Sequence, residues 1–231
     1  MSERFYTPDA LSPGEYVLTG AEAHHLVAVR RFAVGDSLVL FNGDGREYPA
    51  QIVSVGRKEA VLNLLRAEAI SRELSTRIEI ASAMPKGDRG DFLIEKLVEL
   101  GVARFTPLLT ERTIVQPKES RLEKLHQAVI EASKQCGRNV LMEIGPLTRW
   151  EPFANSEFAG ERFVLHPEGE LGEHATATPR TVQFAIGPEG GFTEREVEFA
   201  EECGWKKRSL GSRILRIETA AIAMAAGVAL Q

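Results

Sequence analysis

The sequence predicts an α/β protein with two domains: a small β-rich domain over residues 1–70 and a mostly parallel α/β domain over residues 71–231. Three observations carry this prediction. Residues 1–65 hold short apolar runs separated by tight turns, which is typical of a small β-barrel. The stretch 66–75 is polar with little periodicity, which is typical of a linker. Beyond it, strand-like and helix-like segments alternate, which indicates a parallel sheet.

The first domain is read from its turn signals. Asn42-Gly43-Asp44-Gly45 is a hairpin turn between two apolar runs, and Gly56-Arg57-Lys58 is a second turn. A short helix with His24 and His25 precedes them. The expected elements, in order, are strands at Arg4–Tyr6 and Tyr16–Leu18, a helix at Ala21–Val29, and strands at Ser37–Phe41, Tyr48–Val55 and Ala60–Leu65.

The second domain is read from its alternating periods. A helix at Asp88–Leu100 is expected to bury Phe92, Leu93, Leu97 and Leu100 and to end at Gly101. The other expected helices are Arg121–Gln135, Thr193–Cys203 with a capping box from Thr193 to Glu196, and Glu218–Leu230. The expected strands are Arg77–Ala83, Ala103–Leu108, Phe163–Leu165, Val182–Ile186 and Trp205–Leu210.

Composition limits the classes of function. The net charge of −5 argues against a generally basic nucleic-acid binder, so any RNA surface has to be assembled locally in space. Cys136 and Cys203 form no CxxC motif and are expected as free thiols in a reducing compartment. The chain shows no apolar signal segment and no span long enough for a bilayer, so we expect a cytoplasmic protein.

Several catalytic motifs are absent from the sequence. It contains no phosphate-binding G-x-x-x-x-G-K-[ST], no dinucleotide G-x-G-x-x-G, no G-x-S-x-G nucleophile turn and no H-E-x-x-H. The five histidines lack the spacing of metal ligands, so no metal is expected.

Three strand ends in the second domain share a form. They are Leu165–Pro167, Ile186–Gly191 and Leu210–Leu215. The carboxyl ends of parallel strands meet at one sheet edge, so these loops can converge on one pocket. Glycines let the backbone approach a ligand closely, no lysine follows, and Glu189 would repel an anion. The pattern favours an uncharged or cationic ligand with an adenine-like ring, although ordinary βα turns also contain such glycines.

The chain resembles a known family in the order of its motifs. Ile186–Phe192, followed by Leu210–Ala220, is similar to the paired signature of the SPOUT-class RNA methyltransferases. The nearest match is the RsmE-type 16S rRNA (uracil-N3)-methyltransferases. Further matching pieces are Arg4–Tyr6, His24–Leu26 with Val29–Arg31, Lys86–Arg89, Glu95–Val102, Thr110–Thr113, Glu131–Ala132 with Gln135–Arg138, and Leu165–Pro167.

The resemblance implies a fold and an activity. It implies a deep trefoil knot in the second domain, a PUA-like barrel in the first, and a homodimer. It implies S-adenosylmethionine as cofactor and N3 of a uridine in the decoding region of 16S rRNA as methyl acceptor. An uncrossed chain is the usual rule, so the knot is an expectation from the family alone.

The resemblance also implies roles for particular residues. Those expected at the cofactor are Leu165, His166, Ile186, Gly187, Pro188, Glu189, Gly190, Gly191, Leu210, Ser212, Ile214, Leu215, Thr219 and Ala220. Those expected at RNA are Arg4, Arg30, Arg31, Lys86, Arg89, Arg112 and Arg138, since arginine pairs with phosphate and stacks on bases.

Arg216 and Glu218 are the candidates for catalysis, because they follow the third loop directly; Glu189 and His166 stand behind them. The alternative is a local Arg216–Glu218 ion pair that only positions the last helix. The sequence departs from the family at Ser212, where proline is usual, and at Ile217, where threonine is usual. A non-catalytic RNA-binding assembly factor, or an enzyme of the same class with another RNA target, therefore stays open.

Overall fold

The chain forms two compact units. The computed structural model describes residues 3–114, 116–171 and 181–230. One unit consists of Met1–Glu73 and Ser133–Leu141, and the other of Leu74–Ala132 and Met142–Gln231. No sequence pattern predicts that residues 133–141 belong to the first unit. The domain boundary at residue 70 stays a prediction.

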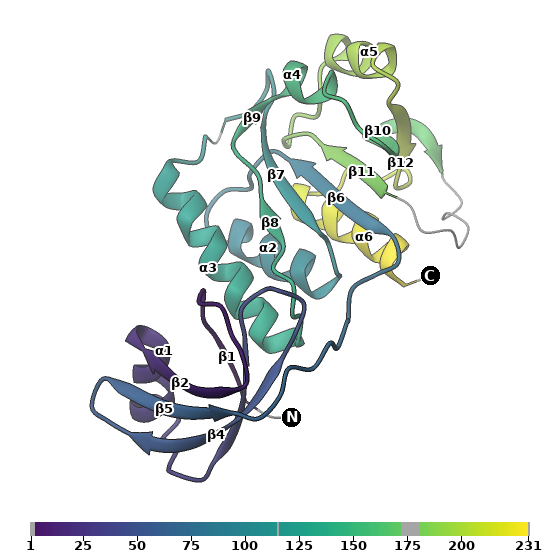
Figure 1. Ribbon diagram of the computed structural model, residues 1–231. Coiled ribbons are helices and arrows are strands. Elements are labelled where there is room, and N and C mark those ends of the chain that lie inside the picture. The colour runs from purple at the N-terminus through teal and green to yellow at the C-terminus, as the bar shows by residue number, and fades with distance from the viewer. Residues whose placement is uncertain (1–2, 115, 172–180, 231) are drawn as a thin grey trace. The chain divides into compact units, whose positions relative to one another are not determined.

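The first unit is built on a five-stranded sheet in the order β1-β3-β4-β5-β2 (Figure 1). Strand β1 pairs with β3 in parallel and the other pairs are antiparallel. Phe5, Leu26, Leu40 and Leu62 are among the side chains of its closed apolar core. Its elements are β1 (Arg4–Tyr6), β2 (Gly14–Thr19), α1 (Gly20–His24), the π-helical turn η1 (His25–Val29), β3 (Ser37–Phe41), β4 (Tyr48–Val55) and β5 (Glu59–Leu64).

The second unit is an α/β domain on a parallel sheet in the order β12-β10-β11-β6-β7-β8, with β9 also paired to β7. Its strands are β6 (Arg77–Ser82), β7 (Arg104–Leu109), β8 (Glu143–Ile144), β9 (Thr148–Arg149), β10 (Glu161–Leu171), β11 (Thr181–Ile186) and β12 (Lys206–Ser209). Its helices are α2 (Arg89–Glu99), α4 (Trp150–Ala154), α5 (Glu194–Glu202) and α6 (Ile217–Ala229), and the division between the units falls within α3 (Glu119–Cys136).

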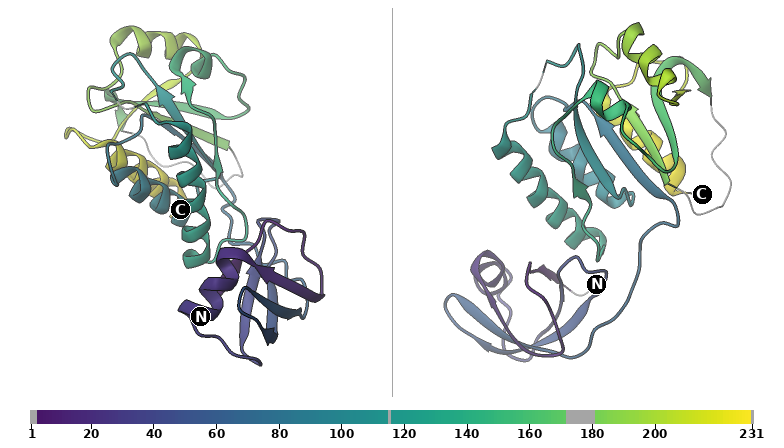
Figure 2. Two further views of the ribbon diagram at one scale, coloured as in Figure 1. Left: turned by 90° about the vertical axis from the view of Figure 1, so that its left-hand side faces the viewer. Right: turned by 45° about the horizontal axis from the view of Figure 1, so that its top comes forward.

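Helices cover the parallel sheet in two groups. Helices α2 and α6 lie side by side against β6 and β11 (Figure 2). Val164 and Ala185 pack with Trp150 and Trp205 in the cluster that includes α4 and α5. Because side chains alternate along a strand, Phe163 and its neighbours on that register point to the other face. The fold class is therefore the expected one, whereas the trefoil knot stays a prediction.

Three local expectations are wrong. Phe92 is 48% exposed rather than buried, because the inward face of α2 is made by Leu93, Ile94, Leu97 and Val98. Strand β10 does not end at Leu165 but continues to Leu171. Strands β8 and β9 and helix α4 were not expected at all, since each is only two to five residues long.

Candidate functional site

The three loops predicted from the sequence surround one pocket in the second unit. It encloses about 650 Å³, part of it open to solvent. The lining residues come from the middle of β10, from the ends of β11 and β12 with the loops that follow them, and from the start of α6. They are Leu165, His166, Pro167, Ile186, Gly187, Pro188, Glu189, Gly191, Arg208, Ser209, Leu210, Gly211, Arg213, Ile214, Leu215, Ile217 and Ala220.

Most residues expected at the cofactor lie in this lining, but three do not. Gly190, Ser212 and Thr219 are outside it, and all three are exposed. Pro167, Gly211 and Arg213, which belong to the three predicted loops, and Ile217 also line the pocket although the sequence did not assign them to the cofactor. Arg208 and Ser209 of β12 were not singled out from the sequence at all, and the basic run Lys206–Arg208 is the signal that could have pointed to Arg208.

The second loop is a tight turn that requires glycine. The Gly191 N–H donates to the Pro188 carbonyl at 2.8 Å, and Gly191 has φ +69°. A Cβ on Gly187 would lie 2.9 Å from the Phe192 nitrogen, so no side chain fits there without moving the backbone. The expected capping box of α5 is present, with Thr193 and Glu196 bonded to each other's backbone. The loop is therefore held in one shape on a well-formed helix start.

The first and third loops come from neighbouring strands. Strand β10 pairs with β12 at Leu165–Arg208 and again at Glu170–Arg208, so the residues between bulge out of the ladder. A Cβ on Gly169 would lie 2.5 Å from the Arg208 carbonyl carbon. The bulge therefore packs directly against the backbone of Arg208, with no space for a side chain at Gly169. This explains why His166 and Pro167 lie at the pocket although the strand continues past them.

Two kinds of charged group lie near the pocket: Arg89 with the two carboxylates that it contacts, and the exposed Arg216. Arg89 donates to Glu218 at 3.4 Å and to Glu189 at 3.5 Å. Glu218 is buried, and its Oε2 has no hydrogen-bond partner among the described residues. Arg216 is exposed at the first position before α6. The alternative Arg216–Glu218 ion pair is thus not formed; Arg89 takes the Glu218 carboxylate instead.

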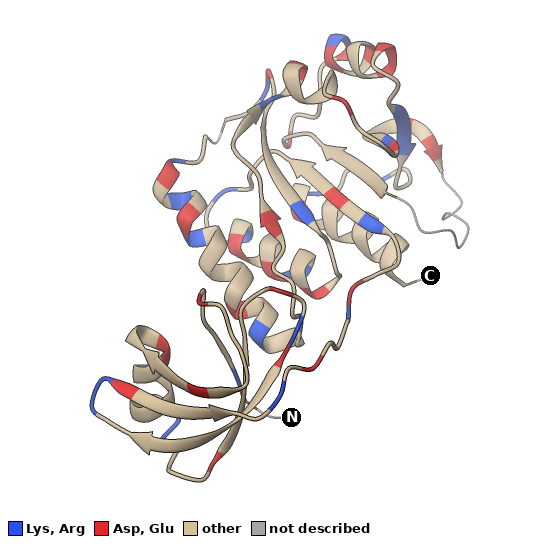
Figure 3. Ribbon diagram, in the orientation of Figure 1, with Lys and Arg blue, Asp and Glu red and all other residues tan. Residues whose placement is uncertain are grey.

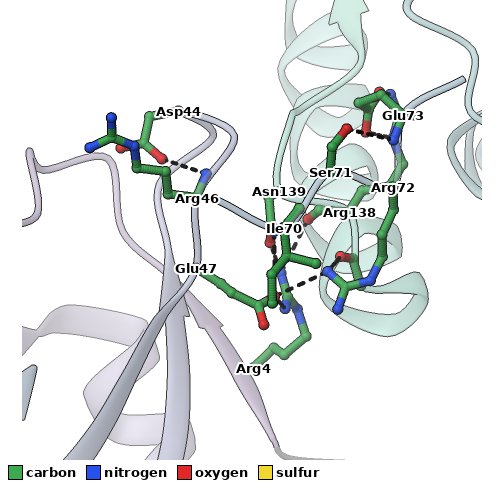
Figure 4. A network of polar contacts seen from close by, with 11 residues as sticks. Arg4, Asp44, Arg46, Glu47, Ile70, Ser71, Arg72, Glu73, Arg138 and Asn139 are labelled. Carbon is green, nitrogen blue, oxygen red and sulfur yellow. Dashed lines mark hydrogen bonds and ion pairs between the residues drawn. The ribbon is translucent and has the colours of Figure 1, made fainter. Parts of the chain in front are cut away.

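Two residues expected at RNA are buried in the first unit. Arg4 is 9% exposed and Arg138 is 3% exposed. Arg4 donates to Glu47 at 2.8 Å and also to Asn139, while Arg138 donates to Glu73 at 3.0 Å (Figure 4). Their guanidinium groups are committed to protein carboxylates. In this structure Arg4 and Arg138 are thus engaged inside the first unit, and their contact with RNA stays a prediction.

Glu47 is the centre of this buried network. It also accepts a hydrogen bond from Arg72 at 3.0 Å. Burial raises the pKa of Glu47, but the hydrogen bonds and charges of Arg4 and Arg72 outweigh burial and leave that pKa below its ordinary value. The carboxylate therefore stays charged at neutral pH, and the network joins β1, Glu47 just before β4, and the segments at 70–73 and 137–139.

The remaining residues expected at RNA have different surroundings. Arg31 and Lys86 are exposed, and Arg31 has φ +57°, a left-handed conformation that is unusual for arginine. Arg30 is paired with Glu3. Arg112 is exposed but donates to the Gly190 carbonyl at 2.7 Å, so it supports the second loop. Arg89 contacts the carboxylates of Glu218 and Glu189.

Comparison with known proteins identifies the family. Residues 72–229 match the RNA methyltransferase domain, and residues 18–65 match the RNA methyltransferase PUA domain. The ribosomal RNA small subunit methyltransferase E of Bacillus subtilis is 31% identical, over 89% of this chain and 86% of that protein. The chain belongs to this family of RNA methyltransferases. Its first unit accordingly contains the family's PUA domain and its second unit the methyltransferase domain.

Solved structures of the family agree over nearly the whole chain. A ribosomal RNA small subunit methyltransferase E from Neisseria gonorrhoeae, bound to S-adenosyl methionine, is 31% identical with a TM-score of 0.89, over 98% of this chain and 96% of that one. A putative methyltransferase from Legionella pneumophila, in complex with the bound cofactor SAM, is 33% identical with a TM-score of 0.91, over 97% and 96%.

The described residues contain neither a helix that could span a membrane nor a cluster that could hold a metal ion. No helix in that part of the chain is both long and apolar enough to cross a bilayer. Within the same residues, no group of three or more His, Cys, Asp or Glu side chains is placed to hold a metal ion.

Proposed function

We propose that the protein transfers a methyl group from S-adenosylmethionine to N3 of a uridine in the decoding region of 16S rRNA, giving 3-methyluridine. The single observation that carries the proposal is the convergence of the three family loops on one pocket. The related proteins are named for methylation of small-subunit rRNA, and two related structures hold this cofactor. The proposal places the reaction in the cytoplasm.

The pocket residues fit the cofactor. Leu165, Ile186 and Leu210 supply an apolar slot for a flat ring, and the absence of a Cβ at Gly187 lets the second loop close tightly against Phe192. The departures from the family at Ser212 and Ile217 leave this lining intact, since Ser212 is outside it and Ile217 contributes an apolar side chain. When bound, S-adenosylmethionine supplies an electrophilic methyl group on its sulfonium.

The chain's own residues have to make the uridine reactive. N3 carries a proton and lies on the pairing edge of the base, so the base has to be unpaired and its N3 proton passed to water. The N3–CH3 bond would then form as the bond between the sulfonium and its methyl breaks, leaving S-adenosylhomocysteine. The exposed Arg216 is the candidate to touch the base and stabilise the negative charge that develops on it. Buried Glu218 acts through Arg89, which in turn contacts Glu189 on the pocket wall. In this proposal Glu218 and Arg89 are positioning residues.

The RNA surface of the proposal is smaller than the sequence implied. It retains Arg30 and Arg31 on the first unit and Lys86 on the second, which are all exposed. Arg89 and Arg112 reach RNA only at the expense of their contacts with the second loop region. A surface with few basic groups is consistent with the net charge of −5.

We extend the proposal to a homodimer, which the family resemblance implies. Ala223, Ala226 and Gly227 on α6 are half-buried and small, so a second chain can approach this helix closely. Ala225, by contrast, is fully buried within the chain and is not available for such a contact. Light scattering of the purified protein tests the dimer, and a monomer mass at micromolar concentration would exclude it.

The experiment that tests the function is mass mapping of methylated nucleosides in rRNA from a deletion strain. We expect 3-methyluridine to be lost from 16S rRNA and restored by the wild-type gene. An Arg216→Gln gene should restore it poorly, since removing one charge-stabilising donor lowers a rate by about 100-fold. Loss of a different methylated nucleoside would indicate another RNA target. No loss, together with no S-adenosylmethionine binding in calorimetry, would indicate an assembly factor.

A further inference from the structure

Arg208 is a half-buried basic residue of the pocket without an ion-pair partner among the described residues, whereas Arg213, which also lines the pocket, is exposed. It lies in β12, where three of the four residues are basic and which Figure 3 shows as a blue strand. Its guanidinium carbon lies 4.5 Å from the centroid of the Phe163 ring. Its Nε is buried without a hydrogen-bond partner, and no carboxylate among the described residues forms an ion pair with it. The residue is only half-buried, so its charge is partly removed from water.

Arg162 provides a comparison within the same unit. It also stacks on an aromatic ring, with its guanidinium carbon 5.0 Å from the Trp205 centroid. Its N–H groups, however, donate to the carbonyls of Ala154, Ser156 and Cys203. Arg162 is a structural arginine with its donors satisfied by protein. Arg208 has the same stacking but no acceptor, and it lines the pocket.

An unsatisfied guanidinium selects its ligand group by chemistry. Arginine has five N–H donors and no acceptor, so its partner has to be an oxygen acceptor, and an anion is preferred. On the proposed cofactor, the adenine and ribose are neutral, and the sulfonium and ammonium are cations. The carboxylate is the only anionic group. Stacking on Phe163 also fixes the plane of the guanidinium, which favours a two-point contact with a carboxylate.

We propose that Arg208 binds the carboxylate of the methionine end of the cofactor and so determines which adenosine derivatives the pocket accepts. This inference rests on the proposed function. It concerns a residue for which the glycine loops predict no role. Glu189, the only carboxylate in the lining, is in contact with Arg89, so it does not neutralise Arg208. The same guanidinium chemistry would also suit an RNA phosphate, and the experiment separates the two sources.

The test is calorimetric binding of three ligands to the full-length protein. S-adenosylmethionine and S-adenosylhomocysteine carry the carboxylate, whereas 5′-methylthioadenosine lacks it. We expect Arg208→Gln to weaken the first two by about 10- to 100-fold, the size of a lost hydrogen bond between charged groups. Binding of 5′-methylthioadenosine should change by less than about twofold. Arg208→Lys should lie in between, because lysine keeps the charge but not the fork.

Lys206→Gln is the matched control. Lys206 lies two residues earlier on the same strand face, with its Nζ 6.0 Å from the same Phe163 ring, but it is exposed and outside the pocket. It should leave the affinity of all three ligands unchanged. Thermal melting of each variant checks that it is folded. If Arg208→Gln does not fold, the affinities of Arg208→Lys test the inference in its place.

Three results would overturn the inference. If Arg208→Gln weakens the binding of 5′-methylthioadenosine as much as that of S-adenosylmethionine, Arg208 only shapes the pocket and does not bind the carboxylate. If cofactor affinity is unchanged while RNA binding without cofactor falls, the anion is a phosphate. If the wild-type protein binds none of the three ligands, the proposed function fails with it. Wild-type binding that does not depend on Arg208 leaves the proposed function standing and removes only this inference.

Discussion

The two units treat their buried charges in opposite ways. In the first unit, Arg4 and Arg138 are buried against Glu47 and Glu73. In the second unit, Arg208 lines the pocket with its Nε buried and without a partner, whereas Glu218 accepts from Arg89 through one oxygen and leaves only its Oε2 without a partner. Unpaired buried charge is costly, so a fold retains it only where something compensates.

The difference teaches how to separate arginines that hold the fold from arginines that meet a ligand. All of them look alike in the sequence. In the first unit each charged side chain of the network has a partner in the same chain, although the Nε of Arg4 has none, so loss of the network should affect stability and not ligand binding. At the pocket the partner is missing, so the loss should affect ligand binding first. Mutations in the two units can therefore distinguish arginines that stabilise the fold from arginines that bind a ligand.

Glu47→Ala should give the largest effect. It leaves Arg4 buried without its carboxylate and removes an acceptor from Arg72, so unfolding free energy should fall by about 3–5 kcal/mol. Urea denaturation measures it. Arg66→Ala is the control, since the Arg66–Glu68 pair is exposed and is worth less than about 1 kcal/mol. A loss for Glu47→Ala no larger than the control would show that the network is not a structural one.

Gly187→Ala should affect the pocket without a comparable loss of stability. The new Cβ meets the backbone nitrogen of Phe192, and such overpacking costs about 1–3 kcal/mol of stability, less than the loss expected for Glu47→Ala. If the loop moves to relieve this contact, S-adenosylmethionine binding should weaken by roughly 10-fold. Gly190→Ala is the matched control, because its Cβ would meet only the flexible side chain of Arg112 at 3.3 Å. Equal affinities for the two variants in calorimetry would argue against the loop as a cofactor wall.

Replacing Arg30 and Arg31 together by glutamine should weaken RNA binding by roughly 10-fold and lower its salt slope by up to about 2. Both are exposed, so stability and cofactor affinity should stay as in the wild type. The control is the double replacement of Arg57 and Lys58, an exposed basic pair on another turn of the same unit. Unchanged RNA affinity in a filter-binding titration would contradict the prediction.

Much of the fold could be predicted from the sequence because local signals coincide with the real elements. The hairpin signal at 42–45 gave the strands Ser37–Phe41 and Tyr48–Val55, and the capping box gave the start of α5. The three loops could be placed on one pocket because the carboxyl ends of parallel strands share one edge of the sheet. These are short-range patterns with a direct physical cause.

The rest could not be predicted because it depends on residues far apart in the chain. Arg4 meets Glu47 across 43 positions and Arg138 meets Glu73 across 65, so nothing local marks either arginine as buried. Arg208 belongs to the pocket only because the bulge after Leu165 folds against it. Phe92 was expected to be buried because its position fits the apolar face of the predicted helix. The inward face of α2 is instead made by Leu93, Ile94, Leu97 and Val98.

The pH dependence of stability gives the smallest and most specific test of the comparison. The pKa of Glu47 in the folded protein lies below its ordinary value of 4.5, because the pull of Arg4 and Arg72 exceeds the effect of burial. A lowered folded-state pKa contributes stability that is fully present above the unfolded pKa and is lost as the pH falls through the folded one. The urea midpoint of the wild type should therefore exceed that of Glu47→Gln by a constant margin above about pH 5, and the margin should narrow as the pH falls below that. If both proteins lose stability in parallel, the acid response comes from other carboxylates, and Glu47 is not the charge on which the first unit depends.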